Sequence, residues 1–180
     1  EFEFEKVCRG PMMPVNREFA WGNPFITDAN QVVFDGTSWE GVVDTILAGT
    51  GIANHGNYST SDLGVLRNGF AGNDSTNRLT IGAAYYGVLE MSGNLWEMCV
   101  NVSTEGLQFT RVNGDGEISL SGEANALSWP LVDGTGAGYR GGGWKSGING
   151  SFRDLAISDR FYAGMKPSTR LDTSGGRGVR

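Results

Sequence analysis

Apolar residues recur at helical spacing at the start of the chain. Phe4, Val7 and Cys8 fall on one side of a helix over residues 1–9, with charged residues on the other side. Gly10-Pro11 follows, and this pair ends a helix because glycine leaves the helical region easily and proline has no backbone N–H to donate. The pattern therefore predicts an amphipathic helix over residues 1–9.

A second apolar run, behind Ser38, has the same helical spacing. Ser38 is a residue type that accepts a hydrogen bond from the first turn of a helix, and Gly49 supplies an end signal. The pattern predicts a second helix over residues 38–48. Its apolar positions are Trp39, Val42, Val43, Ile46 and Leu47.

Polar and glycine-rich stretches fill much of the rest. Residues 49–77 are rich in Gly, Asn, Ser and Thr, which predicts an extended surface loop, and loops of this length are usually functional or held by a bound ion. In residues 107–120, apolar and polar side chains alternate on either side of Asn113-Gly-Asp-Gly116, which predicts a β-hairpin. Residues 139–144 and 151–157 are predicted to form short strands.

The composition indicates one loop-rich domain. A chain of 180 residues is long enough for one domain with its own core. It has 29 glycines, 11% aromatic residues and only 19% charged residues, a mixture that favours many tight turns over a helical bundle or a disordered chain. No apolar run approaches the roughly 20 residues of a membrane span, so we predict no membrane insertion.

Charge is divided unevenly along the chain. Residues 140–180 carry eight Lys or Arg against three Asp or Glu, whereas residues 1–139 carry six against seventeen, for a formal net charge of −6. A basic surface could attract nucleic acid or anionic glycans. The alternative, which we favour, is that the C-terminal arginines pair with carboxylates of the acidic remainder, whose charge would repel nucleic acid. We therefore predict no nucleic-acid partner.

The two cysteines and the single histidine offer little metal chemistry. Cys8 falls on the apolar side of the first predicted helix and Cys99 lies in an apolar segment, so both are expected to be buried free thiols and not a disulfide. His55 has no second His or Cys near it in the sequence, which argues against a zinc site.

A tight turn flanked by two carboxylates lies in the segment Tyr86-Gly-Val-Leu-Glu-Met-Ser-Gly-Asn-Leu-Trp-Glu97. Ser92-Gly93-Asn94 forms the turn, Glu90 precedes it and Glu97 follows it. Such a loop turns carbonyl oxygens inward, and with two carboxylates it can hold a hard cation such as calcium. The alternative is a buried Trp-Glu pair that only closes the turn.

Five segments of the sequence, in a fixed order along the chain, together match a family pattern. They are Glu1-Phe-Glu-Phe-Glu-Lys-Val-Cys-Arg-Gly10, Ala20-Trp-Gly-Asn23, the turn segment 86–97, Tyr139-Arg-Gly-Gly-Gly-Trp144, and the closing set Arg160, Arg170 and Gly178-Val-Arg180. Together they resemble the signature of the formylglycine-generating-enzyme (sulfatase-modifying-factor) family. The resemblance implies an α+β, irregular and loop-rich C-type lectin-like fold in one domain over residues 1–180. Because Glu1 already matches the family's opening pattern, we expect that part of the domain precedes it.

The resemblance implies a structural calcium ion. In the family, one calcium site uses the first residue of the turn segment, two backbone carbonyls and the final Glu. These fall here on Glu90, Gly93, Leu95 and Glu97. The family has Asn at the position of Glu90, and Glu keeps an oxygen ligand there and adds negative charge, so calcium binding is expected to persist.

The resemblance also implies where catalysis would take place. The founding enzymes of the family oxidise a substrate cysteine to formylglycine with copper held by two cysteine thiolates, the soft ligands that copper(I) prefers. Those two positions carry Phe152 and Ile157 in this chain, and neither side chain can hold a metal. We therefore predict that the chain is not an enzyme and binds no copper. The alternative function is a formylglycine-generating oxidoreductase that acts on a cysteine substrate.

In the C-terminal segment, side chains of unrelated chemistry stand between the Gly and Arg residues that match the family pattern. Such a mixture is typical of ligand contacts on loops. The expected ligand-binding residues are Trp144, Lys145, Phe161, Tyr162, Met165, Lys166, Ser168, Thr169, Arg170, Leu171, Asp172 and Thr173. This segment resembles the variable proteins of diversity-generating retroelements in phages and bacteria, which share the lectin-type fold and diversify positions near such a Gly-x-Arg ending. The resemblance implies a non-catalytic binding domain on a virion or bacterial cell surface, with a cell-surface protein or glycan as ligand. The alternative is an ordinary variable surface of a structural relative.

Overall fold

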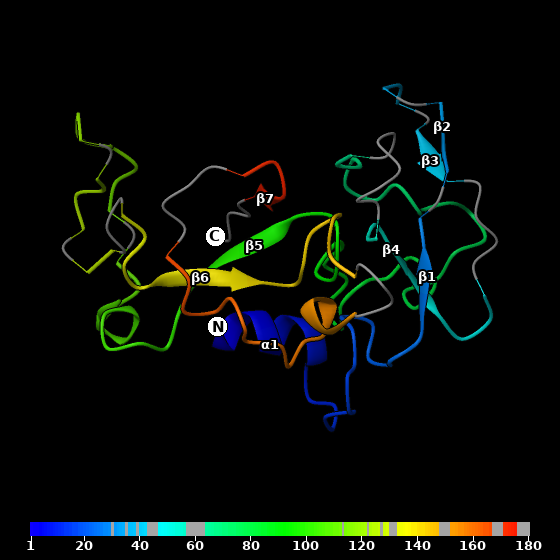
Figure 1. Ribbon diagram of the computed structural model, residues 1–180, viewed down its shortest axis with the longest axis horizontal. Coiled ribbons are helices and arrows are strands. Elements are labelled where there is room, and N and C mark those ends of the chain that lie inside the picture. Colours follow the sequence, from blue (N-terminus) through cyan, green and yellow to red (C-terminus); the bar gives the residue numbers. More distant parts are fainter. Residues whose placement is uncertain are drawn as a thin grey trace.

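A three-stranded sheet lies at the centre of the computed structural model (Figure 1). β5 (Trp96–Val100) is its middle strand, β6 (Ala137–Arg140) pairs with it antiparallel, and β7 (Ser174–Gly175) pairs with it in parallel. Glu97 of β5 lies opposite Arg140 of β6 in this register. The residues that the structure describes are 1–29, 31–34, 36–38, 40–42, 47–56, 64–112, 114–121, 123–126, 128–129, 133–147, 152–166 and 171–175.

Two smaller sheets lie together to one side of the central sheet (Figure 1). In one, β1 (Ile26–Asp28) pairs in parallel with β4 (Gly51–Ala53). In the other, β2 (Val32–Val33) pairs antiparallel with β3 (Gly41–Val42). In the residues that the structure describes, one α-helix, several small sheets and many turns make this a mixed α+β, loop-rich protein, which confirms the coarse fold class expected from the sequence.

The first predicted helix is confirmed as α1 (Phe2–Arg9). Phe4 and Cys8 are its buried residues, and they pack in the main core below β5 and β6, where Figure 1 shows the helix. Acidic residues in the first turn and basic residues in the last turn complement the helix dipole. The helix ends at Gly10, whose φ of 60° lies in the left-handed region that favours glycine.

The main core forms between α1, the turn segment and the chain around residues 152–157. Trp21 is buried in it beside Gly51, and an added Cβ at Gly51 would overlap the indole ring. A second cluster lies under the smaller sheets, with Ile52, Leu66 and Phe70 as its largest members. Burying each such aliphatic or aromatic side chain contributes about 1.5–3 kcal/mol, so these clusters hold the sheets in place.

The predicted helix over residues 38–48 is wrong. Gly41 and Val42 form β3 and pair with β2, and Leu47 is exposed in a turn. Glycine weakens a helix and a β-branched residue such as valine favours a strand, and here a strand partner is at hand. Trp39 and residues 43–46, which supplied most of the apolar spacing, lie outside the described residues.

The surface loop predicted over residues 49–77 is wrong at residues 50–55, whereas residues 64–77 form turns and are mostly exposed, as predicted. It contains β4, and Asn54 and His55 are fully buried. The Asn54 side chain donates to the Gly64 carbonyl at 2.8 Å and to Asn94 Oδ1 at 3.1 Å. A polar composition is compatible with burial where each polar group finds a partner.

Two further strand predictions differ from the structure. The described part of residues 107–120 contains no strand beyond an isolated bridge between Ile118 and Ala124, and Gly106–Gln108 is a 3₁₀ turn. Val112, Ile118 and Leu120 are exposed, so the alternating apolar side has no core to pack on. Residues 153–155 likewise form a 3₁₀ turn in place of a strand.

The predicted strand over residues 139–144 is confirmed only in its first two residues. β6 ends at Arg140 because Gly141 and Gly142 adopt φ values of 85° and 76°, which a strand cannot continue. Cys8 and Cys99 are free cysteines, as expected, but only Cys8 is fully buried and Cys99 is partly buried. None of the helices in the described ranges is long and apolar enough to cross a membrane.

Candidate recognition face

The central sheet has two chemically different faces. Because successive side chains of a strand point to opposite faces, Glu97 and Cys99 of β5 face α1 while Trp96 and Met98 face the other way. On that second face, the Trp96 ring lies 6.5 Å from the Tyr139 ring of β6. The ring of Tyr162 packs edge-on against Trp96 at 5.0 Å. The three rings form an ordered aromatic layer.

This aromatic layer carries the segment 161–165. The backbone N–H of Tyr139 donates to the carbonyl oxygen of Tyr162 at 3.0 Å, and the N–H of Met165 donates to the same oxygen at 3.1 Å. The ring of Phe161 packs edge-on against Tyr162 at 4.8 Å. Phe161 is nevertheless 76% exposed and Met165 49% exposed, so two large apolar side chains stand in water above a fixed base.

A second cluster forms around Trp144. Its indole Nε1 donates to the carbonyl oxygen of Asp172 at 3.2 Å. Lys145 Nζ lies 2.6 Å from Asp172 Oδ2 and 4.5 Å from the centroid of the Trp144 ring. The cation is therefore shared between a carboxylate and an aromatic face, an arrangement that fixes both loops relative to each other.

Trp96 connects the two clusters. Its backbone N–H donates to the carbonyl oxygen of Thr173 at 2.8 Å, while its ring supports Tyr162. A Cβ at Gly143 would lie about 3.0 Å from the Trp96 ring and from the Thr173 carbonyl oxygen, so glycine fits this close approach without crowding its neighbours. We call the surface above Trp96 the recognition face. Its members are Trp144, Lys145, Phe161, Tyr162, Met165, Asp172 and Thr173.

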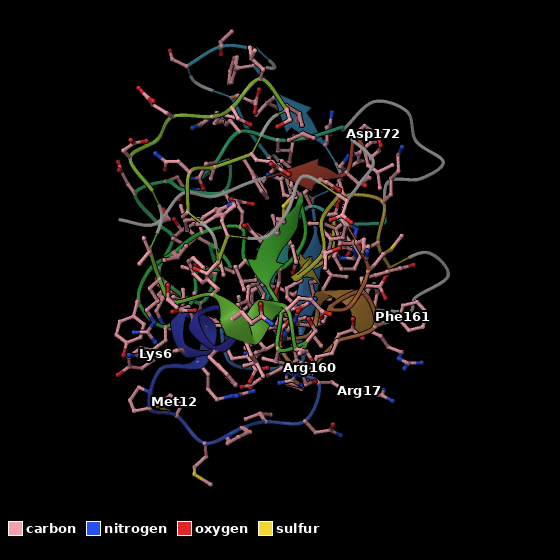
Figure 2. All side chains as sticks on the ribbon, turned by 90° about the vertical axis from the view of Figure 1, so that its left-hand side faces the viewer. Lys6, Met12, Arg17, Arg160, Phe161 and Asp172 are labelled. Carbon is pink, nitrogen blue, oxygen red and sulfur yellow. The ribbon has the colours of Figure 1, made fainter. Side chains whose placement is uncertain are left out.

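Figure 2 shows where this surface lies on the molecule. Phe161 and Asp172 lie at different heights on the same side, and Lys6 and Met12 lie on the opposite side. Met12 and its neighbour Met13 are also strongly exposed. The chain thus has a second exposed apolar surface, away from the recognition face, that can serve as a matched comparison.

The sequence-predicted ligand residues are only partly brought together. All seven members of the recognition face were predicted from the sequence, and Leu171, predicted as well, is exposed beside Asp172. Lys166 instead extends to Asp133, with its Nζ 3.3 Å from Oδ2. Hydrogen bonds from the Thr135 backbone and hydroxyl lower the pKa of Asp133, and the Lys166 charge adds to the effect. Ser168, Thr169 and Arg170 lie outside the described residues.

The sequence interpretation missed the aromatic base of the face. Trp96 was considered only as part of a buried Trp-Glu pair that closes the turn, yet it is only partly buried and lies under both clusters. Met98 and Tyr139 were assigned no role, although Met98 is half exposed on the same side of the sheet as Trp96. The alternation Trp96-Glu-Met98 was the available signal, because it places two large apolar side chains on one face of a strand.

The turn segment is held by several protein contacts. Glu90 has a φ of 61°, and its Oε1 accepts a hydrogen bond from the Gly69 N–H at 3.2 Å. Gly93 has a φ of 91° and donates its N–H to the Gly141 carbonyl oxygen at 2.8 Å. Glu97 is buried in β5 on the α1 side. Glu90 and Glu97 thus flank the turn as predicted, and each carboxylate lies among protein groups.

The expected calcium ligands have suitable chemistry. Two carboxylates and the carbonyl oxygens of Gly93 and Leu95 are hard oxygen donors of the kind that calcium selects. Within the described parts of the chain, no three Asp, Glu, His or Cys side chains form a metal-binding group. A site of two carboxylates and two carbonyls does not require such a group. Calcium binding by this turn therefore stays a prediction.

The two positions that match the family's copper ligands are filled with apolar side chains. Ile157 is fully buried in the main core. Phe152 packs edge-on against the buried His55 ring at 5.0 Å. A cavity of about 430 Å³ lies elsewhere, beside β3 and Phe70, and none of the predicted site residues lines it.

Comparison with known proteins adds no relative. The chain matches no protein-family model, no curated protein and no solved structure.

Proposed function

We propose that this chain is a non-catalytic ligand-binding domain with a C-type lectin-like fold of the formylglycine-generating-enzyme type. It presents the recognition face on a phage or bacterial surface and binds a protein or glycan of a cell surface. A calcium ion at the Glu90–Glu97 turn stabilises the scaffold. The C-terminal residues of the face are positions where variants of the domain differ.

The observation that carries this proposal is the exposure of Phe161 and Met165 above an ordered base. Binding hot spots combine large side chains with a rigid support, because little conformational entropy is then lost on binding. Tyr162 and Trp96 supply that support, and neither exposed side chain contributes much to the core. Lys145 adds a charged group at the other end of the face.

The side chains at the copper-ligand positions support a binding function over the oxidoreductase alternative. Copper(I) needs thiolates or other soft donors, and Phe152 and Ile157 offer carbon atoms only. The two thiols of the chain do not replace them, since burial raises the pKa of both Cys8 and Cys99 and keeps them protonated.

The proposal is tested with an array of purified bacterial surface proteins and surface glycans. The wild-type domain is compared with a Phe161→Ser/Met165→Ser variant. The matched control is Met12→Ser/Met13→Ser, which removes the exposed side chain of Met12 on the opposite side (Figure 2) and that of its neighbour Met13. All three proteins should melt alike, because the changed side chains are exposed.

We expect the first variant to lose binding to the wild-type hits by more than about tenfold, since truncating an anchor residue costs more than about 1.4 kcal/mol. The control should keep every hit. Equal binding by all three proteins, or equal loss in both variants, would overturn the proposal.

The oxidoreductase alternative has its own assay. A Cys-x-Pro-x-Arg peptide is incubated with the protein, copper and oxygen, and the products are measured by mass spectrometry. We expect no aldehyde beyond the level without protein. Protein-dependent conversion of cysteine to formylglycine would refute the non-catalytic assignment.

A further inference from the structure

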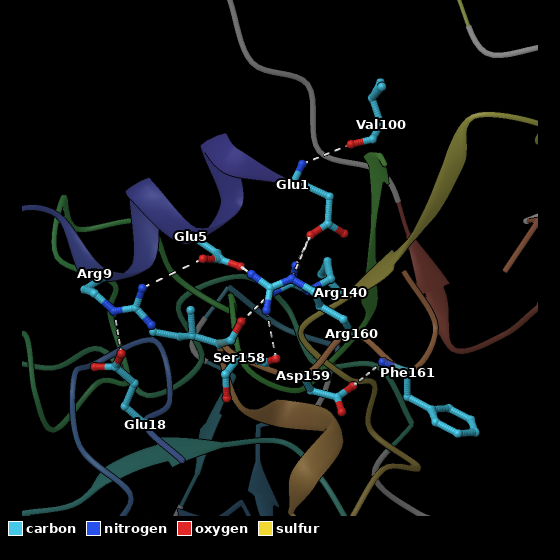
Figure 3. Close-up of polar contacts among 11 residues, drawn as sticks. Glu1, Glu5, Arg9, Glu18, Val100, Arg140, Ser158, Asp159, Arg160 and Phe161 are labelled. Carbon is cyan, nitrogen blue, oxygen red and sulfur yellow. Dashed lines mark hydrogen bonds and ion pairs between the residues drawn. The ribbon is translucent and has the colours of Figure 1, made fainter. Parts of the chain in front are cut away.

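A charged cluster joins α1 to the segment that carries Phe161 (Figure 3). The side chain of Arg140 in β6 is fully buried and pairs with the carboxylates of Glu1 and Glu5, its Nη2 lying 3.4 Å from Glu5 Oε1. The same guanidinium donates to the carbonyl oxygen of Ile157. The chain that follows Ile157 is therefore tied to the N-terminal helix.

Arg160 adds a second link to the same carboxylates. Its Nη2 pairs with Glu5 Oε1, its Nε lies 3.8 Å from Glu1 Oε2, and its Nη1 donates to the Ser158 carbonyl oxygen at 3.2 Å. Figure 3 shows Arg160 turned toward this cluster and the next residue, Phe161, turned away from it. Fixing the direction of Arg160 therefore fixes the backbone from which Phe161 projects.

The other contacts near Phe161 do not depend on side-chain identity at position 160. The N–H of Ala163 donates to the carbonyl oxygen of Arg160 at 3.1 Å, and the N–H of Tyr139 donates to that of Tyr162 at 3.0 Å. These two are backbone bonds, which other residues would also make, and the Phe161 N–H in addition donates to Asp159 Oδ2 at 3.3 Å. The guanidinium of Arg160, with its planar fork of donors, is the group at this turn that is specific for a carboxylate partner.

We propose that Arg160 is a positioning residue for ligand recognition. Paired with Glu5 of α1, it holds the turn so that Phe161 projects from the recognition face in one direction. This inference rests on the proposed function, because the direction of Phe161 matters only if that face binds a ligand. A fixed anchor loses less conformational freedom on binding than a mobile one. The Arg160 side chain is 52% exposed, so its ion pairs should add little to global stability.

The test places 4-fluorophenylalanine at position 161 alone and follows it by ¹⁹F NMR. The variants are Arg160→Gln, Arg160→Lys and the control Arg153→Gln, an exposed arginine of the preceding 3₁₀ turn. In the unchanged protein the signal should be displaced from its position in the urea-unfolded chain, because the ring packs on Tyr162. Thermal melts of all four proteins report global stability separately.

Arg160→Gln should lose at least half of that displacement while its melting temperature stays close to that of the unchanged protein. Arg160→Lys, which keeps the charge but not the fork, should give an intermediate displacement, and Arg153→Gln should change nothing. A displacement unaffected by Arg160→Gln would overturn the inference. So would an equal change in the Arg153→Gln control.

The array assay then separates this inference from the proposed function. Arg160→Gln should weaken the same hits as Phe161→Ser/Met165→Ser. If the Phe161 variant loses its hits but Arg160→Gln keeps them, the positioning role is wrong and the binding function stands. If neither variant loses a hit, the binding function is wrong and the positioning role falls with it.

Discussion

Replacing Arg140 by methionine should strongly destabilise this domain. The guanidinium is fully buried, pairs with the carboxylates of Glu1 and Glu5, donates to the Ile157 carbonyl oxygen and lies 4.9 Å from the centroid of the Phe4 ring. Methionine keeps much of the apolar stem and removes every donor. The side chain of Glu1 is only 3% exposed and would then be left buried without its main cation.

The magnitude follows from that burial. Removing one partner of a buried ion pair costs about 3–5 kcal/mol, because the remaining charge is desolvated without compensation. In a domain of this length, each kcal/mol lowers the melting temperature by about 2–4 °C. Arg140→Met should therefore lower it by about 6–20 °C. Arg153→Met, at an exposed position, should change stability by less than about 0.5 kcal/mol.

The assay is thermal and urea unfolding followed by circular dichroism. Adding Glu1→Gln to Arg140→Met should recover part of the loss, because the uncompensated charge is then removed. An Arg140→Met protein that melts within about 2 °C of the unchanged protein, a shift worth less than about 1 kcal/mol, would refute the reasoning. The same holds if Glu1→Gln destabilises the Arg140→Met protein further.

Three more predictions concern metal, thiols and pH. A calcium chelator should lower the melting temperature, because only the folded turn brings the calcium ligands together. Glu97→Gln should abolish this effect of the chelator, whereas the exposed control Glu105→Gln should keep it. Identical melts with and without calcium would contradict this prediction. Burial raises the pKa of the Cys99 thiol to about 11 and that of Cys8 further, so both should react slowly with iodoacetamide in the folded protein, Cys8 more slowly, as mass spectrometry can measure. Burial, aided by the nearby Asp159 charge, raises the pKa of the Asp154 carboxyl group. The folded state therefore holds the Asp154 proton more tightly than the unfolded chain does, and at neutral pH the ionised carboxylate opposes folding. Asp154→Asn should therefore raise the melting temperature slightly at neutral pH, a gain that shrinks as the pH falls through the raised pKa; a gain that is constant across pH would count against this.

The parts of the fold that were predictable are those specified by neighbouring residues. α1 combines helical spacing, complementary end charges and a Gly-Pro stop within eleven positions, so its prediction needed no tertiary information. The helix expected behind Ser38 failed because apolar spacing alone cannot distinguish a helix from a short strand that finds a partner. β2 supplied that partner for Gly41 and Val42.

Burial of polar residues was beyond prediction from composition. Asn54 and His55 sit in a stretch that is polar enough for a surface loop, yet both are fully buried. Asn54 is tied to Asn94, 40 positions later, by side-chain and backbone hydrogen bonds. Pairing over such a separation leaves no local trace in the sequence.

The candidate face was predictable in its exposed part and not in its base. Trp144, Lys145 and Asp172 were all predicted as ligand-binding residues, and the structure brings the three together. The family resemblance, and not periodicity, supplied those positions. Trp96 was missed as the connecting residue because its role depends on two loops that approach it from far along the chain.

The most direct test of the recognition face is to map where a ligand sits on it. Hydrogen–deuterium exchange is measured on the domain alone and on the domain saturated with its strongest hit from the array. We expect slower exchange on binding in residues 139–147 and 158–166. Residues 10–13, which include Met12 on the opposite side (Figure 2), should be unchanged. Slower exchange confined to residues 10–13, or to any region away from Trp96, would contradict the claim that this face is the binding site.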